Sequence, residues 1–306
     1  MDEKILAQFF DDIKMDKENV YSSEIVTNLI KVAEAELNHL KIPYKPSKKN
    51  PNILNLFHKD ENPLRYVKGF YLNNSRLGNL ICKDKFLTQR FLENAQIKTP
   101  VGKMFNPDEL EKAKSFINQS PEKSFVLKPV SMSMSLGTFL NVGASNLVNS
   151  WTESFKVQKK YDVKNPRVLI QEQIKGLELR IIVLEGRIGS AVFRGPGNVM
   201  GDGKHSIKEL INIKNAQREK HNYLKRNPLL INENLLRNLE SKNLTIDTVL
   251  PEGEYCVLYS QSSIATGREV FEVSKYLDQN IFDQVLQAVT AIPGVHTAGV
   301  DIVVNN

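Results

Sequence analysis

The stretch that decides the fold reads Phe125-Val-Leu-Lys-Pro-Val130, then Ser131-Met-Ser-Met-Ser-Leu-Gly137, then Thr138-Phe-Leu-Asn-Val142. An apolar run, a loop of small residues and a second apolar run predict two strands joined as a hairpin. Lys128 at the end of a buried strand is costly unless it meets an anion, and backbone N–H groups of the loop could bind the same anion. The pattern favours a polyphosphate site. A lysine that merely reaches solvent beside an ordinary turn is the simpler alternative.

Length and composition predict a multi-lobed globular protein. The chain has 306 residues, of which 41% are hydrophobic and 25% charged, so we expect two or three lobes. No apolar run is long enough for a membrane helix, and the N-terminus does not resemble a signal peptide. These features predict a cytoplasmic protein with no membrane partner. Cys82 and Cys256 predict neither a disulfide nor a thiolate metal site, and the five histidines lack metal-ligand spacing.

The charge of the chain suits an anionic ligand without identifying it. The formal net charge is +6, which fits a nucleotide, an acidic peptide or a nucleic acid. Because lysine and arginine are spread along the chain, we expect no nucleic-acid partner. A homo-oligomer remains compatible with the sequence.

Local patterns predict several elements around the central hairpin. A helix is expected over residues 84–95, another beginning at Pro107, and a third beginning at the capping box Ser206-Ile-Lys-Glu209. Residues 157–166 are expected to be a polar linker. Glu185-Gly-Arg187 is expected to join strands over 179–184 and 188–193, and residues 297–304 to form a buried strand.

Four motifs, in this order, resemble the ATP-grasp superfamily, and within it the carboxylate–amine ligases of the cyanophycin synthetase and glutathione synthetase kind. The resemblance covers residues 80–304 and depends most on the last and most specific motif. The motifs are Asp84-Lys85 with Thr88, Phe125-Val-Leu-Lys-Pro129, Val168-Leu-Ile-Gln-Glu-Gln-Ile-Lys-Gly-Leu-Glu-Leu-Arg180, and Arg194-Gly-Pro-Gly-Asn-Val-Met-Gly-Asp-Gly203 continuing to Asn212.

The resemblance implies an α+β ATP-grasp fold. Two α/β lobes would hold ATP between antiparallel sheets, preceded by a small N-terminal lobe. The implied divisions are a helical and mixed N-terminal lobe over residues 1–80, a small ATP-grasp lobe with the phosphate loop over 81–174, and a large ATP-grasp lobe over 175–306.

The resemblance also implies the nucleotide-binding residues. Lys85 and Lys128 would hold the phosphates of ATP, with Lys128 also near the adenine, and Glu178 would accept the ribose hydroxyls. The rest of the implied set consists of two short segments. Ser133, Ser135 and Gly137 would fold over the triphosphate, and backbone groups of Gln171, Glu172 and the following residues to Ile174 would pair with the adenine edge.

The implied reaction is Mg²⁺-dependent and forms ADP. A carboxylate would become an acyl phosphate and be captured by an amine of an amino acid or peptide. Arg180 and Arg194 would meet the acyl phosphate or the substrate carboxylate, and Asp301 would bind Mg²⁺. Simpler structural roles stay open for these residues: Lys85 could be a solvated lysine, Glu178 a strand-edge acid, and Arg194 a counter-charge to a turn aspartate.

Three departures from the family pattern put parts of this expectation in doubt. Ser133 and Ser135 stand where the family has glycines, and residues 263–268 only partly match a substrate-contacting segment. The family's further metal ligands, a Glu and an Asn, are expected just after Asp301, where the sequence stops. The pattern therefore predicts either a truncated ligase or, as the alternative, a catalytically silent ATP-binding module.

Overall fold

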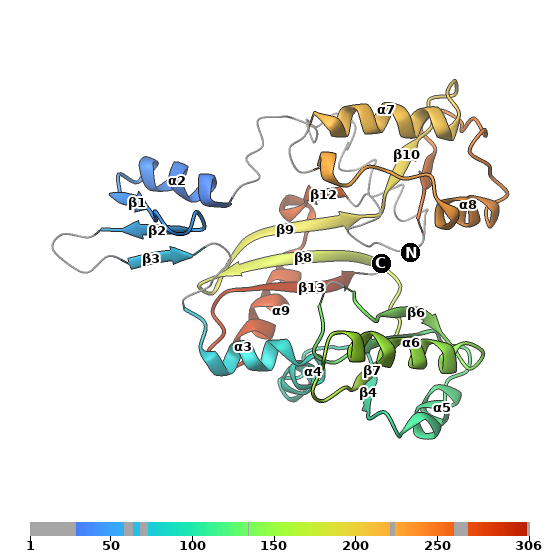
Figure 1. Cartoon of the computed structure of the whole chain (residues 1–306), viewed down its shortest axis with the longest axis horizontal. Helices are drawn as coiled ribbons and strands as arrows, with labels where there is room; N and C mark the ends of the chain where they lie inside the picture. Colours follow the sequence, from blue (N-terminus) through green and yellow to red (C-terminus); the bar gives the residue numbers. More distant parts are fainter. Residues whose placement is uncertain are drawn as a thin grey trace. The chain divides into compact units, whose positions relative to one another are not determined.

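The computed structural model describes residues 29–57, 64–67, 73–133, 135–220, 224–259 and 269–304 (Figure 1). Two compact units are distinguished. Unit 1 contains residues 73–193 and 272–304, and unit 2 contains the described residues up to 67 together with 194–271. The expectations for residues 1–28 and 263–268 lie outside the described part of the chain.

The predicted central hairpin is confirmed and belongs to a four-stranded antiparallel sheet in unit 1. Strand β5 (Phe125–Pro129) pairs with β6 (Phe139–Val142) on one side and with β7 (Val168–Glu172) on the other. Strand β4 (Gly102–Phe105) completes the order β4-β7-β5-β6. Along β5, Leu127 is fully buried whereas Lys128 is half-buried, so the alternation of a strand places the lysine opposite the core face.

Two helices form the core with this sheet. Helices α5 (Leu110–Asn118) and α6 (Leu147–Lys160) contribute Ile117 and Trp151 to a cluster with Phe105 and Phe125. The predicted linker over 157–166 is wrong at its start, because Val157–Lys160 form the last turn of α6. The buried face of α6 includes Ser150, Ser154 and Gln158, and these polar residues mask the apolar periodicity.

The helix predicted over 84–95 is confirmed, whereas the one predicted from Pro107 begins later. Helix α4 spans Lys85–Asn94, and Asp84 both caps it and ends the preceding helix α3 (Arg76–Lys83). Helix α5 begins at Leu110, with Glu109 in the cap position. The Glu109 carboxylate binds the N–H of Asn106, which closes a turn where the helix was expected.

The second sheet has the order β12-β9-β8-β13. Its strands are β8 (Leu177–Leu184), β9 (Arg187–Gly195), β12 (Glu269–Glu272) and β13 (Ala298–Val304), and α9 (Gln279–Thr290) packs against β8 and β13. The predicted hairpin turn is confirmed, and Glu185 and Gly186 have φ values of 50° and 73°. Strand β13 was expected to be buried. It lies at the sheet edge, and none of its residues is fully buried.

Unit 2 contains a further core made by α7 (Ile207–Glu219), α8 (Glu233–Glu240), β10 (Asn198–Met200) and β11 (Tyr255–Val257). The predicted capping box is present, because the Ser206 hydroxyl accepts from the Glu209 N–H while the Glu209 carboxylate accepts from the Ser206 N–H. Unit 2 also contains α2 (Leu29–His39), β1 (Tyr44–Pro46), β2 (Ile53–Leu56), β3 (Leu64–Val67) and the short 3₁₀ turn η1 (Leu224–Arg226), whereas the 3₁₀ turn η3 (Ser274–Tyr276) belongs to unit 1.

Two expectations about the chain as a whole are tested by the described residues. Neither Cys82 nor Cys256 takes part in a disulfide among the described residues. None of the helices in the described ranges has the length and apolar character needed to cross a membrane.

Candidate nucleotide-binding site

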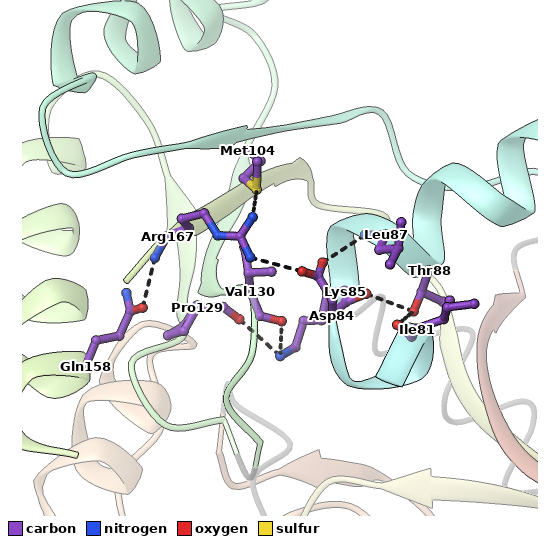
Figure 2. Close-up of polar contacts among 10 residues, drawn as sticks. All are labelled: Ile81, Asp84, Lys85, Leu87, Thr88, Met104, Pro129, Val130, Gln158 and Arg167. Carbon is purple, nitrogen blue, oxygen red and sulfur yellow. Dashed lines mark hydrogen bonds and ion pairs between the residues drawn. The ribbon is translucent and has the colours of Figure 1, made fainter. Parts of the chain in front are cut away.

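Lys85 is held at the start of the loop that follows β5. It is the first residue of α4, and its backbone N–H donates to the Val130 carbonyl at 3.1 Å. Its ammonium group donates to the Pro129 carbonyl at 3.0 Å and to the Val130 carbonyl at 3.3 Å (Figure 2). It also donates to the Met132 carbonyl. Burial lowers the pKa of Lys85, and the negative charge of Asp84 opposes that shift. Lys85 therefore binds main-chain oxygens beside the loop expected to hold phosphate.

Lys128 is a partly buried cation whose charge is not fully offset by neighbouring negative charge. Burial lowers the pKa of Lys128 to about 8, the positive charge of Lys85 lowers it further, and the charge of Asp301 acts in the opposite direction. These electrostatic influences place Lys85, Lys128 and Asp301 in one neighbourhood of unit 1. Two neighbouring ammonium groups, one of them poorly solvated, create a site that an anion stabilises.

The loop between β5 and β6 is a series of tight turns. Ser133 and Ser135 are exposed; the Ser133 carbonyl accepts from Leu136 N–H, and the Ser135 carbonyl accepts from Thr138 N–H. Gly137 has a φ of 68°, and a side chain there would begin 3.0 Å from the Pro129 ring. The loop therefore requires glycine at 137, while the two serines expose their side chains.

Strand pairing already uses much of the backbone expected to face adenine. Gln171 and Glu172 belong to β7, which is paired on both sides, and Glu172 N–H donates to the Val101 carbonyl at 2.8 Å. The Glu172 carboxylate forms an ion pair with Lys123 at 3.2 Å. Ile174 lies beyond the strand, with 36% of its surface exposed. The backbone after β7 is thus better placed than Gln171 or Glu172 to meet a ligand edge.

Glu178, Arg180 and Asp301 lie on neighbouring strands of the second sheet. Glu178 and Arg180 share one face of β8, because residues two apart on a strand point the same way. Arg180 lies opposite Asp301 of β13 and binds both carboxylate oxygens, through Nε at 2.9 Å and Nη2 at 2.8 Å. The expected substrate-binding arginine and the expected metal-binding acid therefore bind each other.

These residues supply only part of the ligand set that a magnesium site needs. Asp301 supplies one carboxylate, and Arg180 already binds both of its oxygens. Within the described ranges, no three His, Cys, Asp or Glu side chains are grouped so that they could hold a metal ion. One engaged carboxylate does not make the oxygen-rich cage that a bound Mg²⁺ ion needs.

The fourth motif lies in unit 2. Arg194 is half-buried on β9. Asp202 accepts from the N–H groups of Lys204 and His205, and its other oxygen lies 2.5 Å from Nδ1 of His205. These contacts hold the pKa of Asp202 well below its usual range and raise that of His205. Asp202 thus has the structural turn role that its position between two glycines predicts.

Two structural contacts near the site were not predicted. Gln171 is buried and donates through its side-chain amide to Gln89 of α4 at 2.7 Å. Arg167, just before β7, forms an ion pair with Asp84 at 3.1 Å (Figure 2). Both contacts join positions more than 80 residues apart in the chain. The local sequence carries no signal for them, apart from the opposite charges of Asp84 and Arg167.

Comparison with known proteins identifies the family. Residues 83–191 match the model of the phosphoribosylglycinamide synthetase ATP-grasp (A) domain. The chain is 28% identical over 272 residues to the glutathione biosynthesis bifunctional protein GshAB of Streptococcus agalactiae, covering 83% of this chain and 33% of that protein. It is 30% identical over 271 residues to GshAB of Streptococcus thermophilus, and this match covers 82% of this chain and 33% of that protein.

A solved structure agrees with these matches at the level of the fold. It is the bifunctional glutathione synthetase of Pasteurella multocida, with a TM-score of 0.61 and 22% identity, covering 89% of this chain and 36% of that one. The chain spans about a third of the length of the curated relatives it matches. The predicted α+β ATP-grasp fold is confirmed. The chain therefore belongs to the ATP-grasp superfamily, and its sequence resembles the GshAB proteins of the glutathione synthetase branch.

Proposed function

We propose that this chain is the ATP-dependent ligase part of an enzyme that joins a carboxylate to an amine. The carboxylate oxygen attacks the γ-phosphorus of ATP, the bond to ADP breaks, and an acyl phosphate forms. The amine then attacks the acyl carbon, phosphate leaves and an amide remains. The observation that carries the proposal is that Lys85 and Lys128 lie beside the loop that ends in Gly137, where the positive charge of Lys85 helps to lower the pKa of Lys128. Such cations and backbone donors suit phosphoryl transfer, which depends mainly on positioning and charge neutralisation.

The remaining roles are assigned within this proposal. Lys85 and Lys128 bind phosphate oxygens, and the loop with Ser133, Ser135 and Gly137 covers them. Of the segment from Gln171 and Glu172 to Ile174, the backbone after β7 meets the adenine. Glu178 meets the ribose, and Arg180 and Arg194 meet the substrate carboxylate or the acyl phosphate. Because the described residues do not complete a magnesium site around Asp301, no step is assigned to the metal.

The substrates are proposed to be small amino acids or peptides. The relatives GshAB carry glutathione biosynthesis in their name, and the structural neighbour is called a glutathione synthetase. A peptide carboxylate and an amino-acid amine are therefore the first pair to test. We also propose the three-lobe division at residues 80 and 174, a cytoplasmic location and the absence of nucleic-acid and membrane partners; a homo-oligomer remains an open alternative.

The proposal is tested by following ADP release from ATP and Mg²⁺ while single amino acids and short peptides are added in pairs. We expect ADP release that depends on both an acid and an amine, with an amide product detected by mass spectrometry. Lys128→Ala should abolish the release. ADP release that needs no acceptor, or that survives Lys128→Ala, would contradict the assignment.

The alternative is an ATP-binding module that does not turn the nucleotide over. It is favoured by one observation, the ion pair in which Arg180 binds both oxygens of Asp301. Calorimetry separates the two proposals, because the silent module predicts tight ATP binding without phosphate release for every acid and amine pair.

A further inference from the structure

Asp84 and Arg167 close a ring of contacts around the base of the phosphate loop (Figure 2). The Arg167 guanidinium donates from Nη2 to Oδ2 of Asp84 at 3.1 Å, and the next residue, Lys85, donates its N–H to the Val130 carbonyl at 3.1 Å. The Val130 N–H in turn donates to the Arg167 carbonyl at 3.1 Å. The ring therefore runs through Asp84, Lys85, Val130 and Arg167 and returns to Asp84.

This ring fixes three elements against one another. Asp84 uses its other oxygen, Oδ1, to accept from Leu87 N–H at 2.8 Å, so the same carboxylate caps α4 and binds Arg167. The Arg167 N–H donates to the side chain of Gln158 on α6 at 3.2 Å, and its Nη1 donates to the Met104 sulfur on β4 at 3.3 Å. The start of α4, which carries Lys85, is thereby joined to the sheet that carries the phosphate loop.

The guanidinium group of Arg167 is not needed merely to fill space in the protein. Its Nε atom is buried and has no hydrogen-bond partner in the described structure. The side-chain Nε2 of Gln158 is likewise buried and has no hydrogen-bond partner there. Leaving buried donors unpaired costs stability, so an apolar side chain would fill the space at lower cost. What an apolar residue could not do is hold the Asp84 carboxylate, because that contact needs a charged hydrogen-bond donor.

We propose that Arg167 is a positioning residue for nucleotide binding, which acts through Asp84 to set Lys85 and the base of the loop over residues 131–137. The inference rests on the proposed function, because it assumes that Lys85 and this loop meet the triphosphate. Arg167 itself touches no phosphate in this proposal. Without it, Asp84 at the start of α4 loses its ion pair with the residue that precedes β7, and the Lys85 ammonium is held less firmly at the base of the loop.

The first test compares Arg167→Met with Arg237→Met. Arg237 pairs with Glu233 on α8 at the same 3.1 Å but is solvent-exposed and lies in unit 2. For Arg167→Met we expect the ATP dissociation constant from calorimetry to rise about tenfold or more, because small misplacements of binding groups are costly. Arg237→Met should bind ATP as the wild type does. Equal ATP affinity in wild type and Arg167→Met, both folded, overturns the inference.

A second measurement is made without nucleotide, so that it tests the positioning role even if the protein does not have the proposed function. Hydrogen exchange of the amides in residues 127–142 should be faster in Arg167→Met than in wild type, and unchanged in Arg237→Met. A wild type that binds no ATP overturns the proposed function, whereas unchanged exchange in Arg167→Met overturns the positioning role. A purely structural Arg167 would instead speed exchange evenly across the first sheet.

Asp84→Asn provides a variant that keeps the helix cap, since asparagine is as good a cap as aspartate. It removes the charge that Arg167 binds, so we expect weaker ATP binding and faster loop exchange, as in Arg167→Met. The double variant should lose no more affinity than either single variant, because both changes break the same contact. Losses that add independently would show that the two residues act separately. If Arg167→Met fails to fold, Asp84→Asn alone tests whether the contact between Asp84 and Arg167 positions the nucleotide-binding residues.

Discussion

The proton of Lys128 is held weakly in the folded chain. Its pKa of about 8 follows first from burial and then from the neighbouring charge of Lys85. An anion bound beside the ammonium group favours the protonated form and returns the pKa toward its ordinary value. Nucleotide binding and protonation of Lys128 should therefore be coupled.

The first prediction is that ATP affinity falls as the pH rises through about 8. If only the protonated lysine binds phosphate, affinity should drop roughly tenfold near pH 9. Calorimetry across this pH range checks the slope, and Lys128→Met should bind ATP weakly with no such slope. A wild-type affinity that is constant between pH 7 and about 9 would contradict the coupling.

Through the same pKa shift, a rise in pH should weaken ATP binding but increase the stability of the nucleotide-free protein. Unfolded Lys128 keeps its proton up to its ordinary pKa of 10.5, whereas folded Lys128 loses it near 8. Between these values the unfolded chain binds more protons, so this group makes the free energy of unfolding rise with pH. We expect urea unfolding of wild type to show a component of this sign that Lys128→Met lacks. An identical pH dependence in both proteins would exclude the shift.

At the level of elements, the contact between β4 and β7 depends on glycine. A side chain at Gly102 would begin 2.5 Å from Cγ of Gln171 and 3.0 Å from the Ile170 carbonyl. Gln171 cannot yield freely, because its amide binds Gln89 of α4 in the protein interior. The packing of α4 on the sheet is therefore sensitive to a single methyl group.

Gly102→Ala should accordingly lower the free energy of unfolding by about 1–3 kcal/mol, the usual cost of overpacking. Gly143→Ala is the matched control, since a side chain there meets nothing within 4 Å. Urea unfolding of both variants gives the comparison. Equal stabilities would mean that Gln171 shifts without cost.

The start of α7 offers an independent test in unit 2. Ser206→Ala removes the hydroxyl that accepts from Glu209 N–H and should lower stability by about 1 kcal/mol. Ser206→Asp, which can still cap the helix, should retain most of that stability. The same loss in both variants would show that the hydroxyl cap contributes little.

For the whole molecule, the candidate phosphate-binding groups are concentrated in unit 1. The charges of Lys85 and Asp301 both act on Lys128, and all three residues belong to that unit. A ligand that binds only the native state stabilises it by an amount that grows with the logarithm of the ligand concentration, about 2.7 kcal/mol at a concentration 100 times its dissociation constant. Protection should be greatest in the segments that contact the ligand.

Hydrogen exchange with and without ATP gives the last prediction. Amides in residues 85–88 and 128–139 should be protected by ATP, while those of α8 in unit 2 should exchange at an unchanged rate. Protection confined to α8, or protection at neither place under saturating ATP, would contradict the site described for unit 1.

Amino-acid patterns predict the hairpin around Lys128, the helix at Asp84, the Glu185-Gly186 turn and the Ser206 cap, and the order of four motifs predicts the family. The local elements depend on residues close together in the chain, where side-chain spacing and backbone preferences act directly. The polar buried face of α6, with Ser150, Ser154 and Gln158, and the contact of Arg180 with Asp301 became evident only in the folded protein. The tertiary structure likewise paired Arg167 with Asp84 across 83 positions. Such contacts depend on how strands and helices pack, because opposite charges can pair only after the chain has brought them together.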